Sequence, residues 1–174
     1  MRWILLIICC GILGLVVPVR SSTAQDEVSA RARKLHFSSI VIDTHDDTTQ
    51  RLIWDHLDLG HRDPAGHIDI PRMREGGLGA IFFSIWIPGS VTGPPAIKQA
   101  LDQIDAVREQ IRLHPNDLML ATTADDIRRA HAQGKIAALM GMEGGHMIAS
   151  DLGVLRMYAA LGVRYLTLTH SVNG

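Results

Sequence analysis

The amino-acid sequence predicts an α/β fold with a parallel sheet, in the form of an incomplete (β/α)8 TIM barrel. Four apolar runs show no polar–apolar alternation, as is typical of strands in a parallel sheet with helices on both faces. Helical patterns separate these runs, which favours a repeating βα order. Polar residues with metal-binding chemistry follow several of the predicted strands. These three observations carry the fold prediction.

The predicted strands are residues 40–43, 78–87, 135–142 and 165–169. Helices are predicted over residues 26–36, 97–111, 127–133 and 152–161. The second of these has apolar residues at three- and four-residue steps and ends at Pro115, which cannot continue a helix. Thr123 and Asp126 resemble a capping box at the start of the third helix, and Gly134 is placed to end it.

A doubly wound sheet would have the same order of elements, and the positions of the polar residues favour the barrel instead. His45 and Asp47 follow the first predicted strand, Glu143 follows the third and His170 ends the fourth. The carboxyl ends of barrel strands converge on one face, where active sites form. A complete barrel needs about 200–250 residues. We therefore expect residues 25–174 to be the N-terminal part of such a domain.

The first 24 residues predict a signal peptide. Arg2 precedes an apolar stretch over residues 3–17, and the small residues Ser22 to Ala24 offer a cleavage site. The apolar stretch is shorter than the roughly 20 residues of a membrane-spanning helix. We expect export to the periplasm or the extracellular space after cleavage near Ala24. An uncleaved N-terminal anchor is the alternative, and it would be the only route to membrane association.

Composition narrows the possible partners and ligands. The chain has 17 basic and 18 acidic residues without a basic run, so a nucleic-acid partner is not expected. A small molecule is the expected partner, and a homodimer is left open. Both cysteines, Cys9 and Cys10, lie in the predicted signal peptide, so the mature chain has no thiolate ligand. Any metal must be held by His, Asp or Glu.

His45 and Asp47 are the clearest candidate metal ligands. Side chains two residues apart on an extended segment leave the same side of the backbone, so an imidazole and a carboxylate here can share one divalent ion. Glu143 has two carboxylate oxygens and could bridge two ions about 3.5–4 Å apart. The alternatives are a polar turn after the first strand and a surface glutamate before the glycine turn at residues 144–145.

His170 could be a metal ligand, a proton donor or a hydrogen-bond donor to a substrate, or it could be structural. His146 is expected to pack beside the glycine turn. The remaining histidines are expected to have surface or packing roles; they are His36, His56, His61, His67, His114 and His131.

Several motifs resemble those of the renal (membrane) dipeptidase family, peptidase family M19, over residues from about 40 to the end. They are residues 43–47 (DTHDD), 67–80 (HIDIPRMREGGLGA), 138–146 (ALMGMEGGH), 152–156 (LGVLR) and 161–170 (LGVRYLTLTH). The resemblance implies a barrel of the metal-dependent hydrolase type with two zinc ions (Zn2+). It also implies that His45 and Asp47 bind the first ion and that Glu143 bridges both ions. His170 would contact the substrate or stabilise the developing oxyanion, so Glu143 and His170 are the expected catalytic residues.

The predicted activity is zinc-dependent hydrolysis of dipeptides, with the second zinc held by histidines on later strands that this chain does not include. By itself this chain is expected to be inactive, because half a barrel would leave an open sheet edge. Two alternatives remain. One is another amidohydrolase acting on lactones or cyclic amides, although the H-x-H pair and bridging lysine common in those families are not seen. The other is a truncated, non-catalytic binding protein.

Overall fold

The computed structural model describes residues 28–170, in which five strands form one parallel sheet. The strands are β1 (Val41–Asp46), β2 (Leu78–Trp86), β3 (Leu118–Leu120), β4 (Ile136–Glu143) and β5 (Val163–Thr167). The helices are α1 (Ala30–Ser38), α2 (Thr49–Trp54), α3 (Ile70–Glu75), α4 (Pro94–Leu113), α5 (Ala124–Ala132) and α6 (Leu152–Leu161), with a 3-10 turn η1 (Gly145–Ile148). The predicted signal peptide lies outside the described residues.

The sheet has the order β1-β2-β4-β3, and β5 also pairs with β4. Short β3 pairs with the start of β4, at residues 136–138, whereas β5 pairs with its end, at residues 140–143. The opposite edge of β4 pairs with β2 over residues 137–143. Thus β3 and β5 share one edge of β4, one after the other, and every strand in the sheet runs in the same direction.

The four predicted strands all exist, but the last one is displaced. It was predicted over residues 165–169, with His170 at its end, and β5 instead runs over Val163–Thr167. Gly162 ends α6 with φ +116°, a conformation that glycine adopts easily, and the chain enters β5 at the next residue. His170 therefore lies three residues beyond the strand, in the loop that follows it. Helices α2 and α3 and strand β3 were not predicted.

The two faces of the sheet differ. Alternate residues of β2 and β4, including Ile81, Ile85 and Met140, pack in a large core with α2, α3, α4 and α6. We call this the helix-covered face. The opposite face carries Ala80 and Phe82 and, at the carboxyl ends of the strands, Glu143; we call it the open face. There a smaller core forms between the amino ends of the strands and α5.

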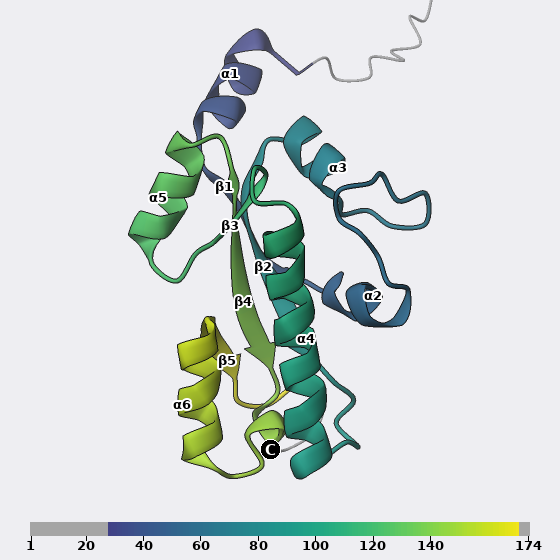
Figure 1. The fold of residues 1–174 in the computed structure, drawn as a ribbon. Helices are drawn as coiled ribbons and strands as arrows, with labels where there is room; N and C mark the ends of the chain where they lie inside the picture. Colours follow the sequence, from purple (N-terminus) through teal and green to yellow (C-terminus); the bar gives the residue numbers. More distant parts are fainter. Residues whose placement is uncertain (1–27, 171–174) are drawn as a thin grey trace, which may run out of the picture.

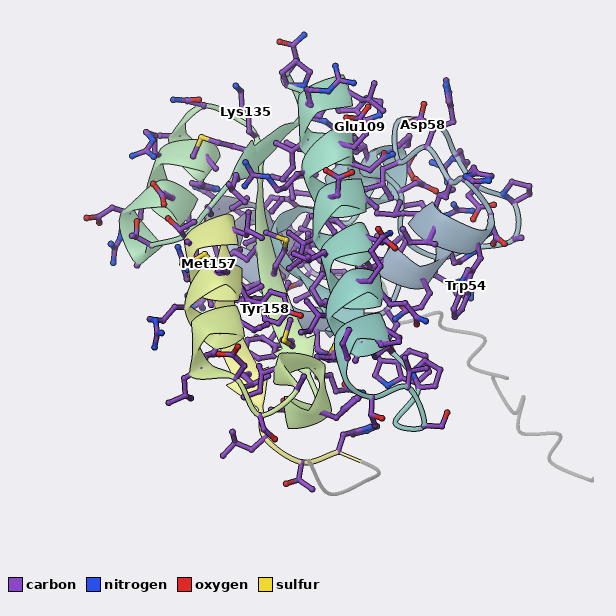
Figure 2. All side chains as sticks on the ribbon, turned by 60° about the horizontal axis from the view of Figure 1, so that its bottom comes forward. Trp54, Asp58, Glu109, Lys135, Met157 and Tyr158 are labelled. Atoms are coloured by element: carbon purple, nitrogen blue, oxygen red, sulfur yellow. The ribbon has the colours of Figure 1, made fainter. Side chains whose placement is uncertain are left out.

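Figure 1 shows α4 running along the length of β4, with α5 near the amino end of that strand and α6 near its carboxyl end. In Figure 2, α4 and α6 lie side by side, and Tyr158 is on the side of α6 nearer to α4. Tyr158 is buried, and its hydroxyl donates a hydrogen bond to the Met147 carbonyl at 2.9 Å. Among residues 28–170 no helix combines the length and the apolar character needed to cross a bilayer.

Candidate metal centre

Three of the predicted site residues lie together at the carboxyl ends of the strands. His45 Nε2 is 2.7 Å from Glu143 Oε2 and 3.4 Å from Asp47 Oδ1. One ligand atom from each residue lies within 4.8 Å of the other two. His45 is in β1, Asp47 follows it directly, and Glu143 is the last residue of β4. Residues nearly a hundred positions apart in the sequence thus form one cluster.

A bulge in β1 aims His45 at this cluster. Asp43 pairs with Ile81 and Asp46 pairs with Phe83, so β1 has one residue more than β2 between these two pairs. An extra residue bends its strand and redirects the side chains beside it. The Asp43 carboxylate accepts a hydrogen bond from the backbone N–H of His45 at 3.0 Å, which holds the backbone in this conformation.

Glu143 connects the cluster to His170. Its Oε1 is 3.1 Å from His170 Nδ1, while its Oε2 faces His45. Only 14% of the Glu143 side chain is exposed, against 54% for His170. One carboxylate therefore lies between two imidazoles, with the more exposed imidazole on the outer side.

The glycine pair after β4 explains how His170 reaches Glu143. The N–H groups of Gly144 and Gly145 donate to the carbonyls of Thr167 and Leu168, each at 3.0 Å. Gly144 has φ +116°, and a Cβ on Gly145 would lie 2.7 Å from the Leu168 oxygen. Gly144 therefore has the positive φ that glycine adopts easily, and Gly145 allows a close backbone approach. They join the loop after β4 to the loop after β5.

The cluster lines a cavity of about 440 Å³ on the open face, formed by His45, Asp47, Gln50, Trp86, Glu143 and His170. Gln50 is buried, and its Nε2 donates to the Trp86 carbonyl at 2.9 Å. Neither Gln50 nor Trp86 was predicted as a site residue, because an amide or an indole side chain outside a known motif does not by itself indicate a functional site.

A second cavity, of about 550 Å³, lies beside residues 145–150 and is also lined by Gly89 and Gly93, in the loop between β2 and α4. His146 lines this cavity and not the cluster. A Cβ on Gly144 would lie 2.6 Å from the His146 ring, so this ring packs against the glycine turn as expected. His36 and His114 contact the Gly76 carbonyl and the Asp58 carboxylate, away from the cluster.

Tyr165 also belongs to the site and, like Gln50 and Trp86, was not predicted from the sequence. Its hydroxyl is 2.7 Å from His45 Nδ1 and 3.2 Å from the Thr44 carbonyl oxygen. Burial raises the pKa of the Tyr165 phenol, and the nearby carboxylates, Glu143 foremost, raise it further. The phenol is therefore uncharged at neutral pH. In the sequence Tyr165 is one apolar position of a strand, and only the sheet brings it to His45.

The donor atoms suit a divalent ion. An imidazole nitrogen and two carboxylates are ligands for zinc and similar ions, and no thiol is needed. Within residues 28–170 this is the one group of three or more His, Cys, Asp or Glu side chains that can converge on an ion. Parallel strands with such a cluster at their carboxyl ends are typical of metal-dependent hydrolases with an α/β barrel.

The particular family follows from comparison with known sequences. The family described as membrane dipeptidase (peptidase family M19) matches residues 29–174. The chain belongs to this family, as the motifs predicted. Dipeptidase ataJ of Aspergillus terreus is 38% identical over 63% of this chain. Dipeptidase tcpJ of Claviceps purpurea is 34% identical over 64% of it.

Solved structures agree. The M19 dipeptidase AC matches 76% of this chain with a TM-score of 0.70 and 30% identity. A metallopeptidase from Rhodobacter sphaeroides, solved with a phosphinate mimic of the dipeptide L-Ala-D-Ala, matches 73% with a TM-score of 0.67 and 27% identity. The predicted α/β fold of the barrel type is confirmed. The chain spans 29% and 28% of the two curated relatives and 43% and 44% of the two solved chains.

Proposed function

We propose that the protein of which this chain forms part hydrolyses dipeptides with the help of zinc held by His45, Asp47 and Glu143. The observation that carries this proposal is the convergence of three ligand atoms within 4.8 Å, in a chain of a dipeptidase family. The dipeptide mimic bound to the Rhodobacter sphaeroides relative supports the substrate class.

A divalent ion at this site would supply a Lewis acid that activates water and polarises the scissile carbonyl. The chain's own residues would position the reactants. Glu143 offers one oxygen toward His45 and the other toward His170, so a second ion could share it. We propose two zinc ions per active site, with the remaining ligands of the second ion coming from outside residues 28–170.

We assign His170 to the substrate. It is more than half exposed, and its Nδ1 lies 3.1 Å from Glu143 Oε1. The other ring nitrogen, Nε2, can donate a hydrogen bond when it carries hydrogen. It would donate to the carbonyl oxygen of the substrate as negative charge develops on that oxygen.

The decisive experiment uses the protein at its natural length, loaded with zinc. We expect it to hydrolyse L-Ala-D-Ala and to leave simple lactones and cyclic amides intact. Glu143→Gln should lower turnover at least about a hundredfold and reduce bound zinc, because a bridging carboxylate is lost. Glu109→Gln is the matched control, since Glu109 lies on the surface of α4 beside Arg112 (Figure 2). Lactone hydrolysis without dipeptidase activity would reject the proposal.

We also propose that residues 1–24 are cleaved and that the protein is exported, with residues 25–174 forming part of the barrel domain. The support is the composition of the N-terminal segment alone. Mass spectrometry of the mature protein should find Gln25 at its amino terminus. Inactivity of the 174-residue chain alone and formation of a homodimer remain predictions, to be tested by assay of this chain and by sedimentation of the natural-length protein.

A further inference from the structure

The side of His45 that faces away from the carboxylates contacts Tyr165. The imidazole has two nitrogens, and they face different partners: Nε2 faces Glu143 and Asp47, while Nδ1 faces the Tyr165 hydroxyl at 2.7 Å. A neutral imidazole carries hydrogen on one nitrogen and a lone pair on the other. Which nitrogen holds the hydrogen decides whether His45 can bind an ion beside the carboxylates.

The Tyr165 hydroxyl has a second partner that sets its direction. It lies 3.2 Å from the Thr44 carbonyl oxygen, which can only accept a hydrogen bond. When the phenol donates to Thr44, its oxygen lone pairs are left to accept from His45. Hydrogen on Nδ1 would leave the Nε2 lone pair on the side of Glu143 and Asp47, where an ion can take it.

The ring of Tyr165 is held in place for this contact. Tyr165 pairs with Gly141 of β4, and a Cβ on Gly141 would lie 1.9 Å from the phenol ring. The ring therefore lies directly over the glycine, where no other residue would leave room for it. Phe82 packs on it with ring centroids 5.3 Å apart. The hydroxyl is thus positioned by a sheet partner and an aromatic neighbour.

We propose that Tyr165 is a positioning residue that fixes the hydrogen of His45 on Nδ1 and presents Nε2 to the metal. The proposal rests on the proposed function, because it assumes that His45 is a ligand. Partners that orient a ligating histidine typically contribute 10- to 100-fold to metal affinity.

The test is zinc titration of the metal-free protein at its natural length. Tyr165→Phe keeps the ring and removes the hydroxyl, and we expect zinc affinity to fall about 10- to 100-fold. Tyr158→Phe is the matched control: it removes a buried hydroxyl that bonds the Met147 carbonyl, and it should leave zinc affinity unchanged. His45→Ala should weaken binding more than Tyr165→Phe does.

The second measurement follows the Nδ1 hydrogen of His45 in the zinc-loaded protein, independently of activity. In 15N-edited NMR spectra this hydrogen should exchange slowly with water, because the Tyr165 hydroxyl accepts it. In Tyr165→Phe it should exchange faster. Equal exchange in the two proteins, or zinc affinity within about twofold of the unchanged protein in Tyr165→Phe while His45→Ala is impaired, would overturn the role of Tyr165 alone. Unimpaired binding by His45→Ala would overturn the metal site itself.

Discussion

The helix-covered face and the open face of the sheet are built from the same strands but have different composition. In β4, Ala138, Met140 and Met142 face the covered side and are all buried. On the open side, Ala137 and Leu139 are likewise apolar and buried under α5. The next two residues of β4 on this side are Gly141 and Glu143. The covered face is apolar along its whole length, whereas the open face changes from apolar to polar toward its carboxyl end.

Because of this difference, the covered face contributes mainly to stability, and the carboxyl end of the open face carries the candidate metal ligands. Four helices bury the covered face, so its side chains stabilise the fold by apolar burial. Within residues 28–170 no helix packs on the carboxyl end of the open face, where the candidate metal ligands line a cavity. We therefore expect substitutions on the covered face to lower stability and substitutions at the carboxyl end of the open face to lower zinc affinity.

The largest expected effect is on the covered face. Ile85 is fully buried there, and Ile85→Ala should lower the free energy of unfolding by about 2–5 kcal/mol, because it removes buried methyl groups and leaves a cavity. Urea unfolding at neutral pH measures this loss. Glu143→Gln, at the open end and measured without zinc, should lower the unfolding free energy by much less, because the amide is close in shape to the carboxylate and leaves no cavity. Equal losses in the two variants would contradict the separation of the faces.

The next effect is on the open face and concerns affinity. Gly141→Ala would force the Tyr165 ring away, since the new Cβ would lie 1.9 Å from it. The ring can move outward, so we expect the fold to persist and zinc affinity to fall about tenfold or more. Gly79→Ala in β2 is the control, because its nearest contact would be an ordinary 3.4 Å from Ile40. Calorimetric titration with zinc compares them, and equal affinities would reject the prediction.

A smaller loss of stability is expected when the capping carboxylate of a helix is removed, and this loss should differ between the two faces. Asp69 caps α3, on the covered side, and its carboxylate is fully buried with the Arg72 guanidinium and N–H as partners. Burial raises the pKa of Asp69, but these hydrogen bonds outweigh it and hold the pKa below its usual range. Asp69→Ala should cost up to about 2 kcal/mol of stability. Thermal unfolding should show a smaller loss of stability for Asp126→Ala, in α5 on the open side. A larger loss in Asp126→Ala than in Asp69→Ala would contradict the difference between the two faces.

The smallest effect is the acid dependence of α5. The pKa of Asp126 is lowered mainly by the hydrogen bond from the backbone N–H of Thr122. Burial raises this pKa, and hydrogen bonds with the side chains of Thr122, Thr123 and Arg129 lower it further. A lowered folded-state pKa means that the carboxylate stabilises the fold above its ordinary pKa and that this contribution is lost as pH falls toward the folded value. Unfolding measured between about pH 6 and pH 3 should therefore depend less on pH in Asp126→Asn.

Asp125→Asn is the matched control for this acid dependence. Asp125 is exposed and bonds only the Arg128 side chain among the contacts described for it. Its variant should keep the full pH dependence. A variant at Asp126 with unchanged acid sensitivity would show that the capping box contributes nothing measurable.

Elements with strong local patterns were predictable from the sequence. The apolar runs predicted β1, β2 and β4, and periodicity with end signals predicted α4, α5 and α6. Helices α2 and α3 have six residues each, too few for periodicity to be recognised, although Asp69 followed by Pro71 is a helix-start signal that could have predicted α3. Strand β3 has three residues and depends on its pairing with β4.

The site residues that were predicted are likewise those with a recognisable local pattern in the sequence. His45, Asp47 and Glu143 were predicted because each follows or ends a strand and has metal-binding chemistry, and the structure brings them together. The meeting of His170 and Glu143 depends on a backbone contact made by the glycine pair, which spacing alone does not reveal. Tyr165 depends on a glycine 24 positions earlier in the chain. Contacts across the sheet were therefore the part that local patterns could not supply.

The pairing of β4 has a consequence for folding. Glu143 pairs with Trp86 on one side and Thr167 on the other, which fixes the strand's alignment with both neighbours. A slip by one residue would turn every β4 side chain to the opposite face, placing this carboxylate among isoleucines and methionines and Met142 in water. Burying an unpaired charge is so unfavourable that the misaligned sheet would be much less stable than the native one. Glu143, the residue proposed to hold the metal, therefore also favours the correct alignment of β4 during folding.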